Sequence, residues 1–410
     1  MKLIEDLKYR GLIDNYSNEE IFDKLDNEKL NFYIGTDPTA DSLHIGHYCS
    51  VILTARRLQK FGHNATVLIG GGTGLIGDPK PDSERPIITK EQLNINYEGL
   101  RSQIQDKYGF NVVNNYDWLK DINFIDYLRD YGKYFNLNYM LNKETVKSRL
   151  GTGITYTEFS YMIMQSMDYM HLFQNNNITL QIGGSDQWGN ILSGVELIRK
   201  KLGNEVYAFT MPLITKKDGK KFGKSETGTL WLDKEKTSSY ELFQYFINVE
   251  DEMVIEYLRK LTFLEKEEIE KLEISLKNEP HLRIPHKRLA QELITDIHDY
   301  KEYESALKIS EAMFSGNIKD LTKTELKNAC KGLPIITITT NINLLDLLVE
   351  NKIVNSKREG REFVLNGAIS INGEKIVDLE FNINKDISIH DEYIVIRKGK
   401  KNYYLVKFEG

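Results

Sequence analysis

The chain has 410 residues, enough for two or three domains, and its apolar fraction of 40% and charged fraction of 28% are those of a soluble globular protein. The net charge of −6 excludes a uniformly basic nucleic-acid-binding protein, so local patches must bind any such partner. Cys49 and Cys330 lie far apart, which argues against a disulfide framework or structural zinc and fits a reducing compartment. The N-terminus lacks the apolar core of a signal peptide, and no stretch approaches the ~20 apolar residues of a membrane span. We therefore expect a cytoplasmic protein with no membrane partner and no structural metal.

Residues 1–30 read as short amphipathic helices, after which strands and helices alternate. Strand-like runs occur at 31–35, 65–70, 178–183 and 206–213, with helical patterns between them. Nearly continuous apolar strands that alternate with helices predict an α/β fold, a Rossmann-like doubly wound parallel sheet covered on both faces. Ligands of such sheets bind beyond the carboxyl ends of the strands, where Gly35 and the glycine cluster 70–77 fall.

The composition and pattern of the sequence change twice after this region. Residues 248–320 are rich in Glu, Lys and Leu at helical spacing, which predicts a helical domain, and residues 321–343 are irregular enough to be a linker. Residues 344–410 predict a small α+β domain. It has two short helices, at 344–349 and 356–365, followed by β runs at 369–371, 387–389, 393–396 and 403–406. The first domain, with the Rossmann-like pattern, would then be residues 1–247.

The stretch Pro38 to His47 follows the first predicted strand and precedes a predicted helix at 49–61. Asp41 or Ser42 is the expected N-cap, which would place His44 and His47 on the first turn. Two imidazoles at the positive end of a helix dipole suit a phosphate, and Gly46 between them lets a flat base approach the backbone. Two ordinary polar residues at a helix start are the alternative.

A second motif, Lys221-Phe222-Gly223-Lys224-Ser225, lies much later in the chain. Its glycines predict a mobile loop, and Lys221 and Lys224 are two cations spaced to reach one polyphosphate. Nucleotidyl transfer depends on positioning and on stabilising charge at phosphate oxygens, which such a loop opposite two imidazoles can supply. Taken alone, the loop would be a solvated turn.

Together these motifs resemble the signature pair of class I aminoacyl-tRNA synthetases, with the second motif in the form found in bacterial tyrosyl-tRNA synthetases. Further stretches are similar to that family over essentially the whole chain: residues 33–47, 74–79, 158–161 and 181–190. The resemblance implies a tyrosine–tRNA ligase that activates L-tyrosine with ATP and Mg²⁺ to tyrosyl-adenylate and pyrophosphate, then transfers tyrosine to the 3′ end of its tRNA. It also implies a homodimer.

The resemblance assigns roles to individual residues. The catalytic residues would be His44, His47, Lys221, Lys224 and Ser225. ATP would be bound by Asp37, Thr39, Gly46, Arg85, Gly183, Asp186 and Lys224. Tyrosine would be bound by Tyr33, Gly35, Asp78, Tyr161, Gln165, Asp168 and Gln187, with Tyr33 and Asp168 at the phenol hydroxyl and Asp78 and Gln165 at the ammonium group. The helical spacing of Tyr161, Gln165 and Asp168 independently places them on one face.

The C-terminal segment carries cations that suit RNA phosphates. It resembles the small RNA-binding domain of ribosomal small-subunit protein four, and it contains an Asn372-Gly373 pair typical of a hairpin turn. The candidate RNA contacts are Lys357, Arg358, Arg361, Arg397, Lys398, Lys400 and Lys401. A solvated surface with scattered charge is the alternative here.

Three other functions fit the sequence less well. A tryptophanyl-tRNA synthetase shares the histidine motif, but the RNA-binding tail and the pair Tyr33 and Asp168 argue against it. A non-catalytic RNA-binding descendant would have eroded motifs, which are intact here, and a small nucleotidyltransferase would be shorter and lack the RNA-binding tail. Exchange of pyrophosphate into ATP with each amino acid separates these alternatives.

Overall fold

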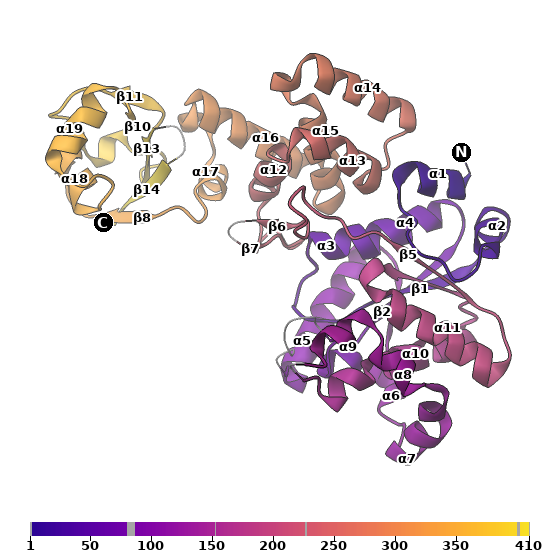
Figure 1. Ribbon diagram of the computed structural model, residues 1–410. Coiled ribbons are helices and arrows are strands. Elements are labelled where there is room, and N and C mark those ends of the chain that lie inside the picture. Colours follow the sequence, from indigo (N-terminus) through magenta and orange to yellow (C-terminus); the bar gives the residue numbers. More distant parts are fainter. Residues whose placement is uncertain (1, 80–86, 152, 226–227, 400–401, 410) are drawn as a thin grey trace. The chain divides into compact units, whose positions relative to one another are not determined.

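The computed structural model describes residues 2–79, 87–151, 153–225, 228–399 and 402–409 (Figure 1). Internal contacts divide the chain into two compact units, residues 1–236 with 249–285, and residues 237–248 with 286–410. The stretch 248–320, predicted as one helical domain, therefore contributes to both units. The predicted domain boundaries stay a prediction.

Five parallel strands form the sheet of the first unit, in the order β3-β2-β1-β4-β5. They are β1 (Asn31–Thr36), β2 (Asn64–Ile69), β3 (Asn111–Asn114), β4 (Leu180–Gly184) and β5 (Tyr207–Met211). The strand order changes direction between β1 and β4, where ligands of such sheets bind. The predicted Rossmann-like parallel sheet is confirmed. Strand β3 was not predicted, because its apolar run is only Val112-Val113 between asparagines.

Helices pack against this sheet and against one another. The helices of the first unit are α1 (Leu3–Arg10), α2 (Glu20–Asn27), α3 (Ile45–His47), α4 (Leu53–Lys60), α5 (Lys90–Arg101), α6 (Tyr116–Leu119), α7 (Phe124–Asp126), α8 (Leu137–Leu141), α9 (Glu144–Arg149), α10 (Tyr156–Asn176), α11 (Trp188–Leu202), α13 (Asp251–Leu261) and α14 (Lys266–Asn278). Helices α4 and α5 contact β2, and α11 contacts β4 and β5. A π-helical turn, Tyr48–Ile52, joins α3 to α4, so one helical run covers residues 45–60. The predicted helix at 49–61 is confirmed and begins earlier than expected.

The second unit combines helices with a smaller sheet. Its helices are α12 (Ser239–Ile247), α15 (Ile284–Ile297, from His286 on), α16 (Tyr300–Ser315), α17 (Lys323–Ala329), α18 (Leu344–Glu350) and α19 (Lys357–Leu365). Its larger sheet has the order β11-β10-β13-β14-β8, from β8 (Ile335–Ile338), β10 (Ile369–Ile371), β11 (Glu374–Ile376), β13 (Tyr393–Lys398) and β14 (Asn402–Phe408). Strands β9 (Ile342–Asn343) and β12 (Asn382–Ile383) form a separate pair.

Most of the helices and strands predicted in the C-terminal segment are present. The two short helices are present, and Asn372 and Gly373, both with positive φ, form the two-residue turn between β10 and β11. The β run predicted at 387–389 is wrong, since a 3₁₀ turn, Lys385–Ile387, occupies its start. The stretch 321–343 holds α17 and β8, and β8 pairs in parallel with β14. In the described part of the chain, no helix has the length and apolar character that a membrane crossing requires.

Candidate active site

A cavity of about 490 Å³ opens beyond the carboxyl ends of β1 and β4, at the point where the strand order changes direction. The side chains and backbone that line it come from β1, β4, α10, the helical run at 45–60 and the segment after β5. Many predicted site residues line this cavity: Tyr33, Gly35, Asp37, Thr39, His44, Gly46, His47, Asp78, Tyr161, Gln165, Asp168, Gly183, Asp186, Gln187 and Lys221. Arg85 lies outside the described residues, as do the side chains of Lys224 and Ser225.

The two histidines of the first motif stack on each other. Helix α3 begins after His44, whose Nδ1 accepts a hydrogen bond from the His47 backbone N–H at 3.2 Å, so His44 is the N-cap. The prediction of Asp41 or Ser42 as the cap is wrong. The ring centroids lie 3.8 Å apart with an 11° angle between planes. A Cβ on Gly46 would lie 2.8 Å from His44 Cε1, so a larger residue there would displace the His44 ring from this stack.

Both imidazoles are arranged as neutral groups. An Nδ1 that accepts a hydrogen bond carries no proton, so the proton of His44 resides on Nε2. Burial, and then the neighbouring His44, lower the pKa of His47 to about 3. Without a phosphate nearby, the pair is therefore neutral.

The lysine motif lies directly against the histidine motif. Backbone hydrogen bonds join Ile45 N–H to the Leu230 carbonyl at 2.9 Å and Leu232 N–H to the Leu43 carbonyl at 2.8 Å. Gly223 has φ +85°, and a Cβ there would lie 2.9 Å from Ile45 Cβ, so only glycine allows this approach. Lys221 lines the cavity, and the structure thus brings this lysine and the two histidines to one pocket.

One end of the cavity combines a buried carboxylate with a buried hydroxyl group. Asp168 on α10 is buried and accepts one hydrogen bond per carboxylate oxygen, from Trp118 Nε1 and from Asn115 Nδ2, both at 2.9 Å. Burial raises the pKa of Asp168 to about 8, although these two hydrogen bonds act in the opposite direction. The Tyr33 hydroxyl is buried and has no hydrogen-bond partner among the described residues. A substrate hydroxyl placed between Tyr33 and Asp168 would satisfy it.

A second group of carboxylates lies at another part of the cavity. Asp37 accepts hydrogen bonds from Tyr161 Oη at 2.9 Å and Thr73 Oγ1 at 2.8 Å. Asp78 accepts from Gln187 Nε2 at 2.8 Å and Asn190 Nδ2 at 3.1 Å. Carboxylates held in this way suit a cationic substrate group such as an ammonium.

The half-buried Lys143 contacts residues that support this second group. The Lys143 ammonium donates to the Gly189 carbonyl, to Ser193 Oγ at 3.2 Å and to Asn190 Oδ1 at 3.5 Å. Its bond to Asn190 Oδ1 leaves the amide nitrogen of Asn190 directed at Asp78. Burial lowers the pKa of Lys143 to about 7.

The sequence analysis missed several of these residues. Asn115 and Trp118 follow β3, which was not predicted, and the Asn114-Asn115 pair after two valines was the signal that could have revealed a strand end in the site. Thr73 lies within the glycine cluster that was placed at the sheet edge, and Lys143 has no signal in the sequence.

The predicted RNA contacts lie in the second unit. Arg358 and Arg361 are exposed and three residues apart on α19, and Lys357 pairs with Asp346. Arg397 NH2 lies 3.5 Å from Ser370 Oγ. Lys398 is turned inward, donating to the Ile353 carbonyl at 2.6 Å and lying over the Phe363 ring. Lys400 and Lys401 lie outside the described residues.

Two family models match the chain. The model "tRNA synthetases class I (W and Y)" matches residues 25–315, and the model of the tyrosine–tRNA ligase SYY-like C-terminal domain matches residues 325–406. The chain is 49% identical to a tyrosine–tRNA ligase of Staphylococcus carnosus, over 100% of this chain and 99% of the relative. It is 48% identical to that of Staphylococcus haemolyticus, over 99% of both chains. Among solved structures, a C-terminally truncated mitochondrial tyrosyl-tRNA synthetase of Aspergillus nidulans aligns with a TM-score of 0.67 and 30% identity, covering 76% of this chain and 94% of that one.

Proposed function

Since the chain belongs to the class I tRNA synthetases of the tryptophan and tyrosine group, and is a tyrosine–tRNA ligase, we propose how its cavity performs amino-acid activation. The observation that carries the proposal is the hydroxyl-accepting end of the cavity. There the buried Tyr33 hydroxyl without a described partner faces a pocket that also holds the fixed carboxylate of Asp168. Tryptophan has no hydroxyl for this end, whereas tyrosine does.

Tyrosine would lie along the cavity, with Asp168 at one end and Asp78 at the other. Its phenol hydroxyl would lie between Tyr33 and Asp168. Its ammonium group would meet Asp78 and the Gln165 side-chain oxygen, which is buried without a hydrogen-bond partner among the described residues. A site that hydrogen-bonds a hydroxyl rejects the analogue lacking it, because its buried polar groups would then stay unpaired. Tyrosine–tRNA ligases are themselves a known example of this general rule.

Activation then joins tyrosine to ATP, which arrives with Mg²⁺ on its phosphates. A carboxylate oxygen of tyrosine attacks the α-phosphorus, a new P–O bond forms, and the bond to pyrophosphate breaks with both electrons leaving on pyrophosphate. We propose that His44 donates from Nε2–H to the phosphate oxygens and that Lys221 stabilises the leaving pyrophosphate. Lys224, Ser225 and Arg85 are proposed as further phosphate contacts on the family resemblance alone.

Adenosine would occupy the part of the cavity near Gly46, Gly183 and Asp186. The glycines lie at close approaches: a Cβ on Gly183 would be 2.8 Å from Ile191 Cδ1. Asp186 lines the same cavity and is proposed to accept hydrogen bonds from the ribose hydroxyls, while Asp37 and Thr39 are proposed as nearby ATP contacts.

The acyl group then passes to a hydroxyl at the 3′ end of tRNA. We propose that Arg358, Arg361 and Arg397 in the second unit contact tRNA phosphates, together with Lys357, Lys400 and Lys401. Lys398 receives less support, because its ammonium is engaged inside the fold. The substrates, tRNA and ATP, favour a cytoplasmic location.

A homodimer is also proposed, on the exposed apolar side chains of one stretch. Phe124 and Ile125 are each 65% exposed, and other large apolar residues of the same stretch are exposed too: Leu137, Tyr139, Leu150 and Tyr156. Exposed apolar surface of this kind marks an interface. Sedimentation of Phe124→Ser/Ile125→Ser should show a smaller species than wild type, with Ile274→Ser, which changes an exposed isoleucine of α14, as the control. An unchanged sedimentation coefficient would contradict the proposal.

Exchange of labelled pyrophosphate into ATP tests the proposed activation. Tyrosine should support exchange, while tryptophan and phenylalanine should not. Exchange with tryptophan alone would refute the assignment of the hydroxyl-accepting end.

A further inference from the structure

A tyrosine outside the cavity holds both strands of the lysine loop. Tyr257 on α13 is 1% exposed, and its hydroxyl donates to the Thr215 carbonyl at 2.9 Å. Its ring lies 4.5 Å from the ring of Phe222, at an angle of 49°. Thr215 and Lys221 face each other across an antiparallel bridge, and Phe222 follows Lys221. One side chain therefore contacts the loop on both sides of the turn from which Lys221 reaches the cavity.

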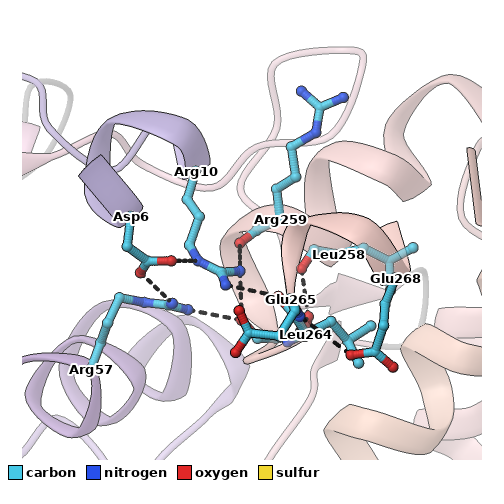
Figure 2. A network of polar contacts seen from close by, with 9 residues as sticks. Asp6, Arg10, Arg57, Leu258, Arg259, Leu264, Glu265 and Glu268 are labelled. Carbon is cyan, nitrogen blue, oxygen red and sulfur yellow. Dashed lines mark hydrogen bonds and ion pairs between the residues drawn. The ribbon is translucent and has the colours of Figure 1, made fainter. Parts of the chain in front are cut away.

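Helix α13 is itself fixed by a buried ionic cluster (Figure 2). Asp6 on α1 accepts a hydrogen bond from Arg10 Nε at 2.7 Å and another from Arg57 NH1 at 3.0 Å. Arg10 donates to the carbonyls of Arg259 and Leu264, both at 2.8 Å. Figure 2 shows Asp6, Arg10 and Arg57 converging on the end of α13.

Both guanidiniums also share one carbonyl just beyond α13. The carbonyl of Thr262 accepts from Arg10 at 3.1 Å and from Arg57 at 2.9 Å. Their fork-shaped donor sets restrict the geometry of this contact.

The net charge of this cluster complements the dipole of α13. Two guanidiniums and one carboxylate leave a net positive charge, and it lies at the C-terminal end of α13, where the helix dipole is negative. All three side chains are at least nine-tenths buried, so moving them apart would leave buried charges without partners. The cluster therefore holds α13 in one position relative to α1 and α4.

Arg57 also connects the cluster to the histidine motif. It lies in the helical run at 45–60. This run begins just after the N-cap His44, and His47 lies in its first turn. The first motif is thus joined through Arg57 to α13, and α13 is joined through Tyr257 to the second motif. None of the described tyrosine-binding residues lies on α13.

We propose that Tyr257 is a positioning residue for amino-acid activation, which sets Lys221 relative to His44 and His47, with the Asp6–Arg10–Arg57 cluster fixing the helix that carries it. The role rests on the proposed function, because it concerns the phosphate contacts of the activation step. It acts on the transition state, in which Lys221 meets the leaving pyrophosphate, and leaves tyrosine binding untouched.

The test is a double-mutant cycle on the rate of adenylate formation in single turnovers. Tyr257→Phe removes only the hydroxyl, and we expect the rate to fall about three- to tenfold, with unchanged tyrosine dissociation constant and melting temperature. In a Lys221→Ala background the same substitution should have little further effect, since the group that it positions is gone. Tyr207→Phe is the matched control, because it loses a hydroxyl bonded to Glu20 in the same unit, and it should leave the rate unchanged.

Each outcome of the double-mutant cycle either supports or overturns the proposal. Additive effects of Tyr257→Phe and Lys221→Ala, an unchanged rate in Tyr257→Phe, or a weaker tyrosine affinity with normal rate would overturn the proposal. Phe222→Leu, which keeps an apolar side chain and removes the ring contact, should lower the rate in the same direction. Failure of the proposed function itself is distinguishable, since wild-type protein would then form no adenylate with tyrosine.

Discussion

Replacing Tyr33 with phenylalanine should make the protein more stable and less active with its substrate. The hydroxyl of Tyr33 is buried without a hydrogen-bond partner among the described residues, and the ring packs 5.4 Å from that of Tyr169. Tyr33→Phe keeps the ring and removes only the oxygen. A buried polar group without a partner costs roughly 1–3 kcal/mol, so its removal should raise the free energy of unfolding by about that amount.

The loss of activity follows from the same hydroxyl. If it bonds the phenol group of tyrosine, its removal forfeits one neutral hydrogen bond, of about 0.5–1.5 kcal/mol. This corresponds to a fall of roughly two- to tenfold in kcat/KM for tyrosine. Phenylalanine makes no such bond, so its kcat/KM should stay the same or rise, and discrimination between the two amino acids should narrow.

Two measurements decide this prediction. Thermal unfolding without substrates should show a melting temperature that is higher by a few degrees. Pyrophosphate exchange with tyrosine and with phenylalanine gives the ratio of kcat/KM. Tyr169→Phe is the matched control, because its hydroxyl donates to the Tyr207 carbonyl at 2.7 Å, and losing that bond should lower stability. A less stable Tyr33→Phe with unchanged discrimination would refute the reasoning.

Three further predictions concern other parts of the molecule. The pKa of His47 is lowered to about 3, so the folded protein binds fewer protons than the unfolded chain between pH 3 and roughly 6.5, and stability should fall as pH drops through that window. His47→Gln should flatten this part of the curve in urea unfolding. Lys143→Met should raise KM for tyrosine about three- to tenfold, through Asn190, and leave KM for ATP unchanged in exchange kinetics. Arg358→Ala with Arg361→Ala should make the dependence of tRNA affinity on salt shallower by roughly one unit of slope per lost phosphate contact, measured by titration.

Structural features that depend only on local sequence were predictable. Strand β1 ends two residues beyond its apolar run, at Thr36, and the histidine motif follows soon after. On α10, Tyr161, Gln165 and Asp168 share a face because helical geometry alone puts them there, and all three line the cavity. These features need no information from distant parts of the chain.

The N-cap of the histidine helix was not predictable in this way. Asp41 and Ser42 are good capping residues, but distant residues bind both of them. Lys236 pairs with Asp41, while Ser42 Oγ accepts from Gln103 Nε2 at 3.0 Å. His44 then supplies the side chain that accepts from the first turn of the helix, and tertiary contacts decide the cap.

The same reason explains the missed support of Asp168. Asn115 and Trp118 come from the end of β3, whose two valines are too short a run to stand out from the flanking asparagines. The strand forms because it pairs with β2 along Thr66–Ile69, a contact between distant segments. The polar partners of Asp168, a proposed tyrosine contact, are then positioned by sheet pairing that leaves little trace in local sequence.

Buried polar atoms without partners are not scattered evenly among the described residues. Several line the cavity beyond the carboxyl ends of β1 and β4: Tyr33 Oη, His47 Nδ1, Gln165 Oε1 and Gln181 Oε1. Each lowers the stability of the free protein, because water is lost from it without a replacement hydrogen bond. Such a concentration is expected where a ligand supplies the missing partners, since local rules are broken mainly at functional sites. In the proposed binding mode, the phenol hydroxyl of the substrate would pair with Tyr33 and its ammonium group with Gln165, so the free energy forgone at these two atoms would contribute to specificity as well as to affinity.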